Sequence, residues 1–177
     1  MNTRLLAILM PIIFVTLSQL AHAQFAVGAT GDIRIGADKV DNVNGVTVLT
    51  GQVDIKQGDV RLLADKVEIF SNGAGGNALV SANDINRMIA TGNFYYITPE
   101  QEVRGDKGVY TSATESFVVM GDVILLQDDS VVTGSRLDYN LQTRDAKVTS
   151  ACKGRKCKKR DRVAILIRST DGQAATN

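Results

Sequence analysis

The stretch from Thr50 to Phe70 constrains the fold more than any other part of the chain. Apolar residues alternate with polar ones there in three runs, at Val53 and Ile55, at Val60 and Leu62, and at Val67 and Ile69. A period of two is typical of a strand with one dry face and one wet face. The runs are separated at residues 57–59 and 64–66, and Gly58 suits a tight reversal of the chain. The stretch therefore predicts three successive short antiparallel strands.

Two short motifs recur along the chain in a shared order. The first is Ala-Asp-Lys-Val at residues 37–40 and 64–67, with looser copies that begin at residues 105 and 134. The second is a glycine, a polar residue and an apolar residue, found at residues 51–53, 92–94 and 121–123. Chance recurrence of common turn sequences is the alternative. The shared order favours a repeated architecture in which each unit covers its neighbour's apolar face.

The remaining residues also indicate strands. Asn44-Gly45 is a strong signal for a two-residue hairpin turn. The apolar residues predict further strands around Ile33 and Ile35 and over residues 94–97, 131–139, 146–149 and 163–167. Residues 117–126 are apolar on both parities and predict a hairpin that is covered on both sides. The chain beyond the N-terminal segment contains no long stretch with a helical period. We therefore expect an all-β fold.

The first 23 residues are predicted to be a secretory signal peptide. An apolar run follows a positively charged start, and Ala21-His22-Ala23 forms a small-residue cleavage site. A retained membrane anchor is the alternative, although the apolar run is shorter than the roughly 20 residues that span a bilayer. Secretion places the domain, residues 24–168, in an oxidising compartment outside the cytoplasm, and residues 169–177 are expected to form a flexible C-terminal tail.

Charge and composition exclude several classes of function. Cleavage removes Arg4 and His22, which leaves 20 − 1 = 19 basic residues against 19 acidic ones and no histidine. A balanced charge argues against general nucleic-acid binding, and the missing histidine excludes His-dependent catalysis or metal binding. Asp128-Asp129 is the one adjacent carboxylate pair, but its place at a predicted hairpin tip argues against catalysis. We expect neither an enzyme nor a cofactor.

Cys152 and Cys157 are the only cysteines. In an oxidising compartment they favour a local disulfide or unpaired thiols over a zinc site, because two thiolates fill only half a tetrahedral shell. They lie in a basic segment, residues 152–162, that carries seven lysines and arginines against Asp161 alone. The segment is either a solvated loop or a contact for anionic phosphates.

Several motifs stand in an order that resembles a known family. They are Thr50 to Gly58 leading into Ala64 to Val67, then Gly92-Asn93-Phe94, Val103-Arg104-Gly105, Phe117 to Val123, Val132-Thr133-Gly134 and Leu137-Asp138-Tyr139. Together they are similar to the OstA-like (LptA) family of periplasmic lipopolysaccharide-transport proteins, over roughly residues 33–148. The basic cysteine-bearing segment departs from the family's pattern.

The resemblance implies a twisted, open β-jellyroll with an apolar interior. It implies subunits that lie in the periplasm, join end to end and carry lipopolysaccharide from the inner to the outer membrane. The partners would be an LptC-like inner-membrane protein and the LptD–LptE translocon, with energy supplied by an ABC transporter elsewhere.

Two sets of candidate residues follow. The apolar residues expected to line a lipid groove are Ile33, Ile35, Val53, Ile55, Phe94, Tyr96, Tyr110, Phe117 and Val119. The residues expected at a head-to-tail seam between subunits are Ile33, Arg34 and Ile35 at one end and Val163, Ile165 and Ile167 at the other.

Three alternatives stay open. The chain could be an LptC-like membrane-anchored member of the same pathway, or a polymerising β-scaffold that carries no lipid. A hydrolase that uses carboxylates alone is the third, and it would need two carboxylates that face one cleft.

Overall fold

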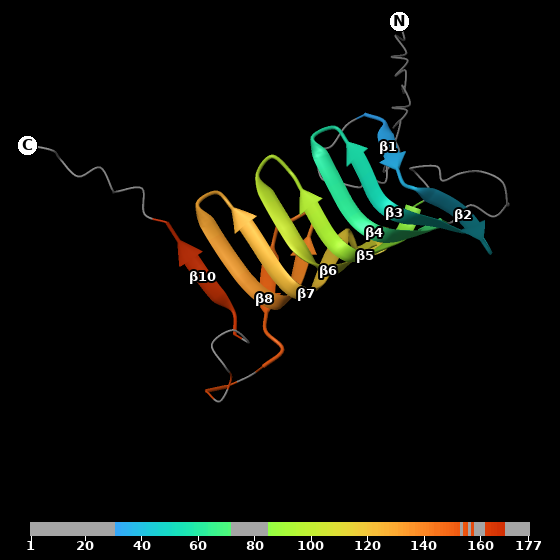
Figure 1. Cartoon of the computed structure of the whole chain (residues 1–177). Helices are drawn as coiled ribbons and strands as arrows, with labels where there is room; N and C mark the ends of the chain where they lie inside the picture. Colours follow the sequence, from blue (N-terminus) through green and yellow to red (C-terminus); the bar gives the residue numbers. More distant parts are fainter. Residues whose placement is uncertain (1–30, 72–84, 153, 156, 158–161, 169–177) are drawn as a thin grey trace, which may run out of the picture.

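The computed structural model describes residues 31–71, 85–152, 154–155, 157 and 162–168, and most of these residues lie in antiparallel strands (Figure 1). The strands are β1 (Ile33–Gly36), β2 (Lys39–Val43), β3 (Val46–Gln57), β4 (Val60–Ser71), β5 (Ile85–Ile97), β6 (Gln101–Thr111), β7 (Ser116–Gln127), β8 (Ser130–Asn140), β9 (Ala146–Thr149) and β10 (Ala164–Ile167). A single 3-10 turn, η2 (Ser112–Thr114), joins β6 to β7. The predicted all-β fold is confirmed. The predicted signal peptide and C-terminal tail lie outside the described residues.

The strands form one sheet that follows the order of the chain. Its path runs β1-β3-β4-β5-β6-β7-β8-β10, with β2 paired to β3 and β9 paired to β8. Figure 1 shows β1 and β2 at one end of the stack and β10 at the other. The predicted Asn44-Gly45 turn joins β2 to β3, and both residues have the positive φ that such a turn requires.

Each long strand, β3 to β8, bends once near its middle. The strand pairing shifts register at these bends, between Thr50 and Val53 in β3 and at the matching place in every later pair. The bends divide the sheet into two arms. Arm A holds β2, β9 and residues 46–50, 66–71, 85–91, 107–111, 116–120 and 136–140, and arm B holds β1, β10 and residues 53–57, 60–64, 94–97, 101–105, 123–127 and 130–134.

The bends correct one expectation about the central stretch. Gly58 and Asp59 do form the turn between β3 and β4. Residues 64–66, however, do not separate two strands, because they lie inside the continuous strand β4. A bulge adds a residue and switches which face the following side chains occupy, so Leu62 and Val67 are both buried although they differ in parity.

The core lies between the two arms. Buried apolar residues from both arms form one cluster, which includes Leu49, Val67 and Val119 from arm A and Val53 and Phe94 from arm B. The ring of Phe94 fills the space where a Cβ on Gly108, in arm A, would stand. The two arms therefore pack their inward faces against each other.

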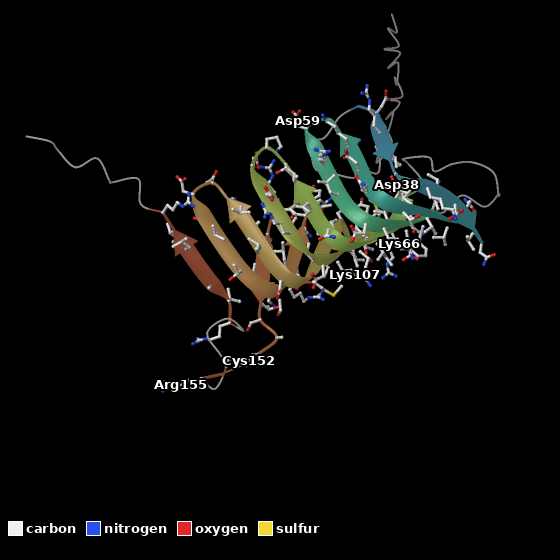
Figure 2. All side chains as sticks on the ribbon, in the orientation of Figure 1. Asp38, Asp59, Lys66, Lys107, Cys152 and Arg155 are labelled. Carbon is white, nitrogen blue, oxygen red and sulfur yellow. A yellow bond between two sulfur atoms is a disulfide. The ribbon has the colours of Figure 1, made fainter. Side chains whose placement is uncertain are left out.

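The outward face of the sheet is charged. Short ion pairs join Lys39 to Asp41 and Lys66 to Glu68 in arm A, at 2.7 and 2.9 Å. In arm B, Arg61 donates two hydrogen bonds to Asp54, which lower the pKa of that carboxyl. Figure 2 shows Lys66 and Lys107 on the same side of the sheet. These charges keep one face of each arm in water.

Candidate lipid-binding interior and open strand edges

Two straight rows of apolar side chains run through the interior from one end of the sheet to the other. The row in arm B joins cross-strand partners in the order Ile35, Ile55, Leu62, Tyr96, Val103, Leu125, Val132 and Ile165. The row in arm A joins Val40, Leu49, Val67, Ala90, Gly108, Val119, Leu137 and Val148. Cross-strand neighbours on one face lie about 5 Å apart, so each row is a continuous apolar track, with the Phe94 ring filling the place of a side chain at Gly108.

The candidate groove residues converge in this interior. The structure buries Val53, Ile55, Phe94, Tyr96, Tyr110, Phe117 and Val119 in one cluster. Ile33 packs partly buried against the same cluster, whereas Ile35 lies at the end of its row and is 43% exposed. The residues thus occupy one apolar space with an accessible end.

Three aromatic rings connect the arms at the centre of the interior. The Phe117 ring, from arm A, lies 5.5 Å from the Phe94 ring and 5.0 Å from the Tyr96 ring, both from arm B. Such pairs add about 0.5–1.5 kcal/mol beyond the area that they bury. An apolar guest between the arms would exchange these contacts for contacts with its own chain.

The interior disfavours charge. Burial, together with the nearby Tyr139 and Tyr110 side chains, raises the pKa of the Tyr96 hydroxyl far above its ordinary value. Burial also raises the pKa of Tyr110, and the carboxylate of Glu115 raises it further. Both groups stay neutral at any physiological pH, so the space suits hydrocarbon better than an ionic ligand.

The two ends of the sheet are open. Within the described residues, β1 pairs only with β3, and β10 pairs only with β8. Large apolar side chains are exposed at both ends, with Val40 at 48% on the β2 side and Ile165 and Ile167 at 64% and 73% on β10. An unpaired strand with exposed apolar side chains is a template for another strand.

Sequence reasoning missed other members of the interior. Leu62, Ile69, Met88, Val103 and Leu137 are as buried as the predicted residues. The same alternation could have found them. Gln57 was not predicted either: it is buried beside β1, where its amide nitrogen donates a 3.4 Å hydrogen bond to the carbonyl of Gly31.

The two cysteines form a disulfide within the segment that connects β9 to β10. Cys152 and Cys157 are bonded, with their α carbons 5.8 Å apart, where the sequence had left a disulfide and free thiols open. Figure 2 places Cys152 and Arg155 below β8. Arg155 and Arg162 are exposed, and the other five cations of the basic segment lie outside the described residues.

The described residues hold no cluster of three or more His, Cys, Asp or Glu side chains that could hold a metal ion. The part of the chain that the structure covers also contains no helix long and apolar enough to cross a membrane.

The bent sheet, its apolar interior and its two open edges define the chain as an open β-jellyroll protein. Residues 31–145 match the family described as "LptA/(LptD N-terminal domain) LPS transport protein". Since this match covers most of the chain, the protein belongs to that family of lipopolysaccharide-transport proteins.

Two known proteins are similar to the chain. An uncharacterized protein of Rhizobium meliloti (strain 1021) is 26% identical over 126 residues, which cover 70% of this chain and 67% of that protein. The crystal structure of LptH from Pseudomonas aeruginosa has a TM-score of 0.62 at 20% identity and covers 78% of this chain and 96% of its own. LptH is described as the LptA-homologous periplasmic component of the lipopolysaccharide transport device, and at this identity the similarity shows the shared fold.

Proposed function

We propose that this protein is a periplasmic bridge that carries lipopolysaccharide from the inner to the outer membrane, with the acyl chains held between the two arms. The observation that carries the proposal is the pair of apolar rows, which run the length of the sheet and reach exposed residues at both open edges, at Val40 and Ile35 on one side and at Ile165 on the other. Family membership supports the transport role.

The physics of the cargo calls for such a path. Exposing an acyl chain to water costs about 0.8 kcal/mol per methylene, so a chain of about 12 carbons costs on the order of 10 kcal/mol. A lipid with several chains crosses water slowly unless it is sheltered along the way. Phe94, Tyr96 and Phe117 would contact the chains midway along the interior, and Ile33 and Ile35 would contact them at the mouth.

The open edges supply a way to extend the sheet beyond one subunit. We propose that β1 and β10 of successive subunits pair, so that Ile33, Arg34 and Ile35 meet Val163, Ile165 and Ile167. Their main-chain groups would complete the sheet, and their exposed apolar side chains would be covered. An LptC-like protein at the inner membrane and the LptD–LptE translocon at the outer membrane would cap the two ends of the assembly.

Photo-crosslinking in cells tests the cargo. A photoreactive residue at Ile35 or Phe94 is expected to give an adduct with lipopolysaccharide, because both face the interior. The matched control is a probe at Arg61, which lies on the outward face and is exposed. Adducts at Ile35 and Phe94 but not at Arg61 would support the groove. No adduct from either inward position, with the protein folded and secreted, would overturn the carrier proposal and leave a polymerising scaffold.

A deletion tests the assembly independently of the cargo. Removing residues 162–177 takes away β10 while the arms keep their other strands. We expect a folded protein that no longer self-associates, measured by light scattering after size exclusion. Oligomers of unchanged size would reject the pairing of β1 with β10. Recovery of the secreted protein only in membrane fractions, with its N-terminus uncut, would instead indicate the LptC-like alternative.

A further inference from the structure

The direction of the strands allows a second copy to continue both arms at once. Each arm contains eight strands in antiparallel order, from β1 to β10 in arm B and from β2 to β9 in arm A. Because eight is an even number, the first and last strands of an arm run in opposite directions. A copy that continues the stack, turned as the twist of the sheet requires, therefore presents β1 antiparallel to β10, and β2 antiparallel to β9.

The straight rows also set the alignment of main-chain groups. Along a row of an antiparallel sheet, hydrogen-bonded and non-hydrogen-bonded pairs alternate. The row takes seven such steps from Ile35 to Ile165, so its first and last pairs are of the same kind. The main-chain N–H and C=O groups of Ile35 and Ile165 therefore either both point into their own sheet or both point away from it. Placing Ile165 opposite Ile35 of the next copy therefore continues the hydrogen-bonding pattern without a break.

In arm B, this register joins opposite charges. With Ile165 opposite Ile35 of the next copy, Ile167 faces Ile33 and all four residues of β10 pair with all four of β1. One position further on, Arg168 faces Asp32 of the next copy on the outward side. Arg168 continues the ladder of β10, since its N–H donates a 3.1 Å hydrogen bond to the carbonyl of Asp129.

Neighbouring registers are worse. The buried and exposed faces must match across the seam, so the next possible registers are shifts by two residues. A shift in one direction puts Arg168 opposite Arg34 of the next copy, and like charges directly opposite each other are destabilising. A shift in the other direction removes the charge pair and leaves half of each short strand unpaired.

In arm A, the charges independently favour the register in which all four residues of β9 pair with β2 of the next copy. When its inward row continues, Val148 faces Val40 of the next copy, a residue that is 48% exposed in the single chain. Lys147 then faces Asp41 of the next copy on the outward side. A shift by two residues places Lys147 opposite either Lys39, which repels it, or Val43, which offers no charge.

From these registers we infer that a second copy of this chain docks end to end along the stack, with Arg168 opposite Asp32 and Lys147 opposite Asp41 of the next copy, so that two charge pairs, one in each arm, set the register of the seam. This inference deepens the head-to-tail assembly proposed above and rests on it. It adds that arm A takes part in the seam through β9 and β2, and that the charges exclude shifted pairings.

Charge reversal at the two ends of arm B tests the inference. The full-length secreted protein is compared with Asp32→Arg and Arg168→Asp variants by analytical ultracentrifugation at low salt. Each variant alone brings like charges together and is expected to raise the dissociation constant about 3- to 30-fold. An equimolar mixture of the two restores an opposite-charge pair at every seam, so its association is expected to return toward the unmodified level.

Two further variants complete the design. Lys147→Glu, which would face Asp41 of the next copy, is expected to weaken association in the same way through arm A. Asp122→Arg is the control, because it reverses an exposed charge on β7, which lies at neither end of the stack, and is expected to leave association unchanged.

The outcomes separate the two proposals. If the unmodified protein stays monomeric at high concentration, the head-to-tail assembly itself is wrong. If it associates but Asp32→Arg and Arg168→Asp associate as tightly as it does, or if mixing them restores nothing, the register is overturned while the assembly stands. If only Lys147→Glu is without effect, the seam runs through arm B alone and the two-arm docking is overturned.

Discussion

The carboxylate of Asp65 lies directly over the α carbon of Gly92, in the place where any other residue at position 92 would put its Cβ. The side-chain amide nitrogen of Asn93 donates hydrogen bonds to both oxygens of the same carboxylate, at 2.9 and 3.2 Å. The relationship recurs at each odd-numbered long strand, since Asp38 covers Gly51 and Asp106 covers Gly121. In the pairs β3–β4, β5–β6 and β7–β8, the even-numbered strand contributes one unpaired residue at the bend, and the odd-numbered strand contributes a glycine and a polar residue opposite it.

Replacing Gly92 with alanine tests this contact. Gly92 has a φ of +79°, so Gly92→Ala strains the backbone and also drives its Cβ into Asp65. We expect the free energy of unfolding to fall by more than the roughly 1–3 kcal/mol typical of a strained residue at positive φ. Urea denaturation gives the value.

The chain offers a matched control for the backbone strain. Gly45 has the same φ of +79°, but nothing lies within 4 Å of a Cβ built there. Gly45→Ala should therefore cost only the strain, and the excess at Gly92 measures the contact with Asp65. Adding Asp65→Ala to Gly92→Ala should recover that excess. Equal costs at positions 45 and 92 would mean that the aspartate does not shape the bend.

The bends explain how much of the fold could be predicted from sequence. Alternation located most of the strands, but it missed β6 (Gln101–Thr111) and took β7 (Ser116–Gln127), which is one continuous strand, for a hairpin. The recurrence of Asp38, Asp65 and Asp106 with Gly51, Gly92 and Gly121 correctly indicated repetition. The contact between these aspartates and glycines could not be predicted from the sequence, because each aspartate contacts a glycine on the next long strand, 13 to 27 residues further along the chain. For the same reason Ala64-Asp65-Lys66 resembled a gap between strands: a bulge and a turn both interrupt the alternation.

The candidate site was predictable to a similar extent. Parity alone identifies residues such as Val53, Ile55, Phe94 and Phe117 as inward-facing. It does not show that Phe94 and Phe117 lie in opposite arms and touch, since that contact depends on the bend at Gly92 and Asn93. The open ends were predictable only as isolated apolar strands at residues 33–35 and 163–167.

Truncating Phe117 should destabilise the interior strongly. Its ring is 3% exposed and contacts both Phe94 and Tyr96. Phe117→Ala is expected to cost about 3–5 kcal/mol, the usual range for a buried aromatic residue. Phe70→Ala, on the outward side of β4, should cost less than half as much. A Phe117→Ala cost no larger than that of Phe70→Ala would show that the arms are not packed together here.

Alkaline pH should weaken the fold through Tyr96. Burial raises the pKa of Tyr96 above its unfolded value of 10.0. Below about pH 10 the hydroxyl is therefore neutral in both the folded and the unfolded chain, and Tyr96 makes its full contribution to stability there. Above pH 10 the unfolded state ionises first, and stability falls by up to about 1.4 kcal/mol per pH unit. Tyr96→Phe should flatten the fall in unfolding midpoint between pH 10 and 11.5. Parallel curves for the two proteins would contradict this.

The disulfide should act locally rather than hold the whole sheet together. It closes a loop with a sequence separation of only 5, for which chain entropy gives at most about 2 kcal/mol. β10 depends on it more than other strands do, because β10 is four residues long and pairs only with residues 130–133 within the described chain. In a Cys152→Ser, Cys157→Ser variant we expect a folded sheet with faster amide exchange at residues 164–167 and unchanged exchange at the central strands β5 and β6. Global unfolding of the variant would mean that the disulfide stabilises the arms themselves. Unchanged amide exchange in β10 would mean that pairing with β8 alone is enough to hold β10 in place.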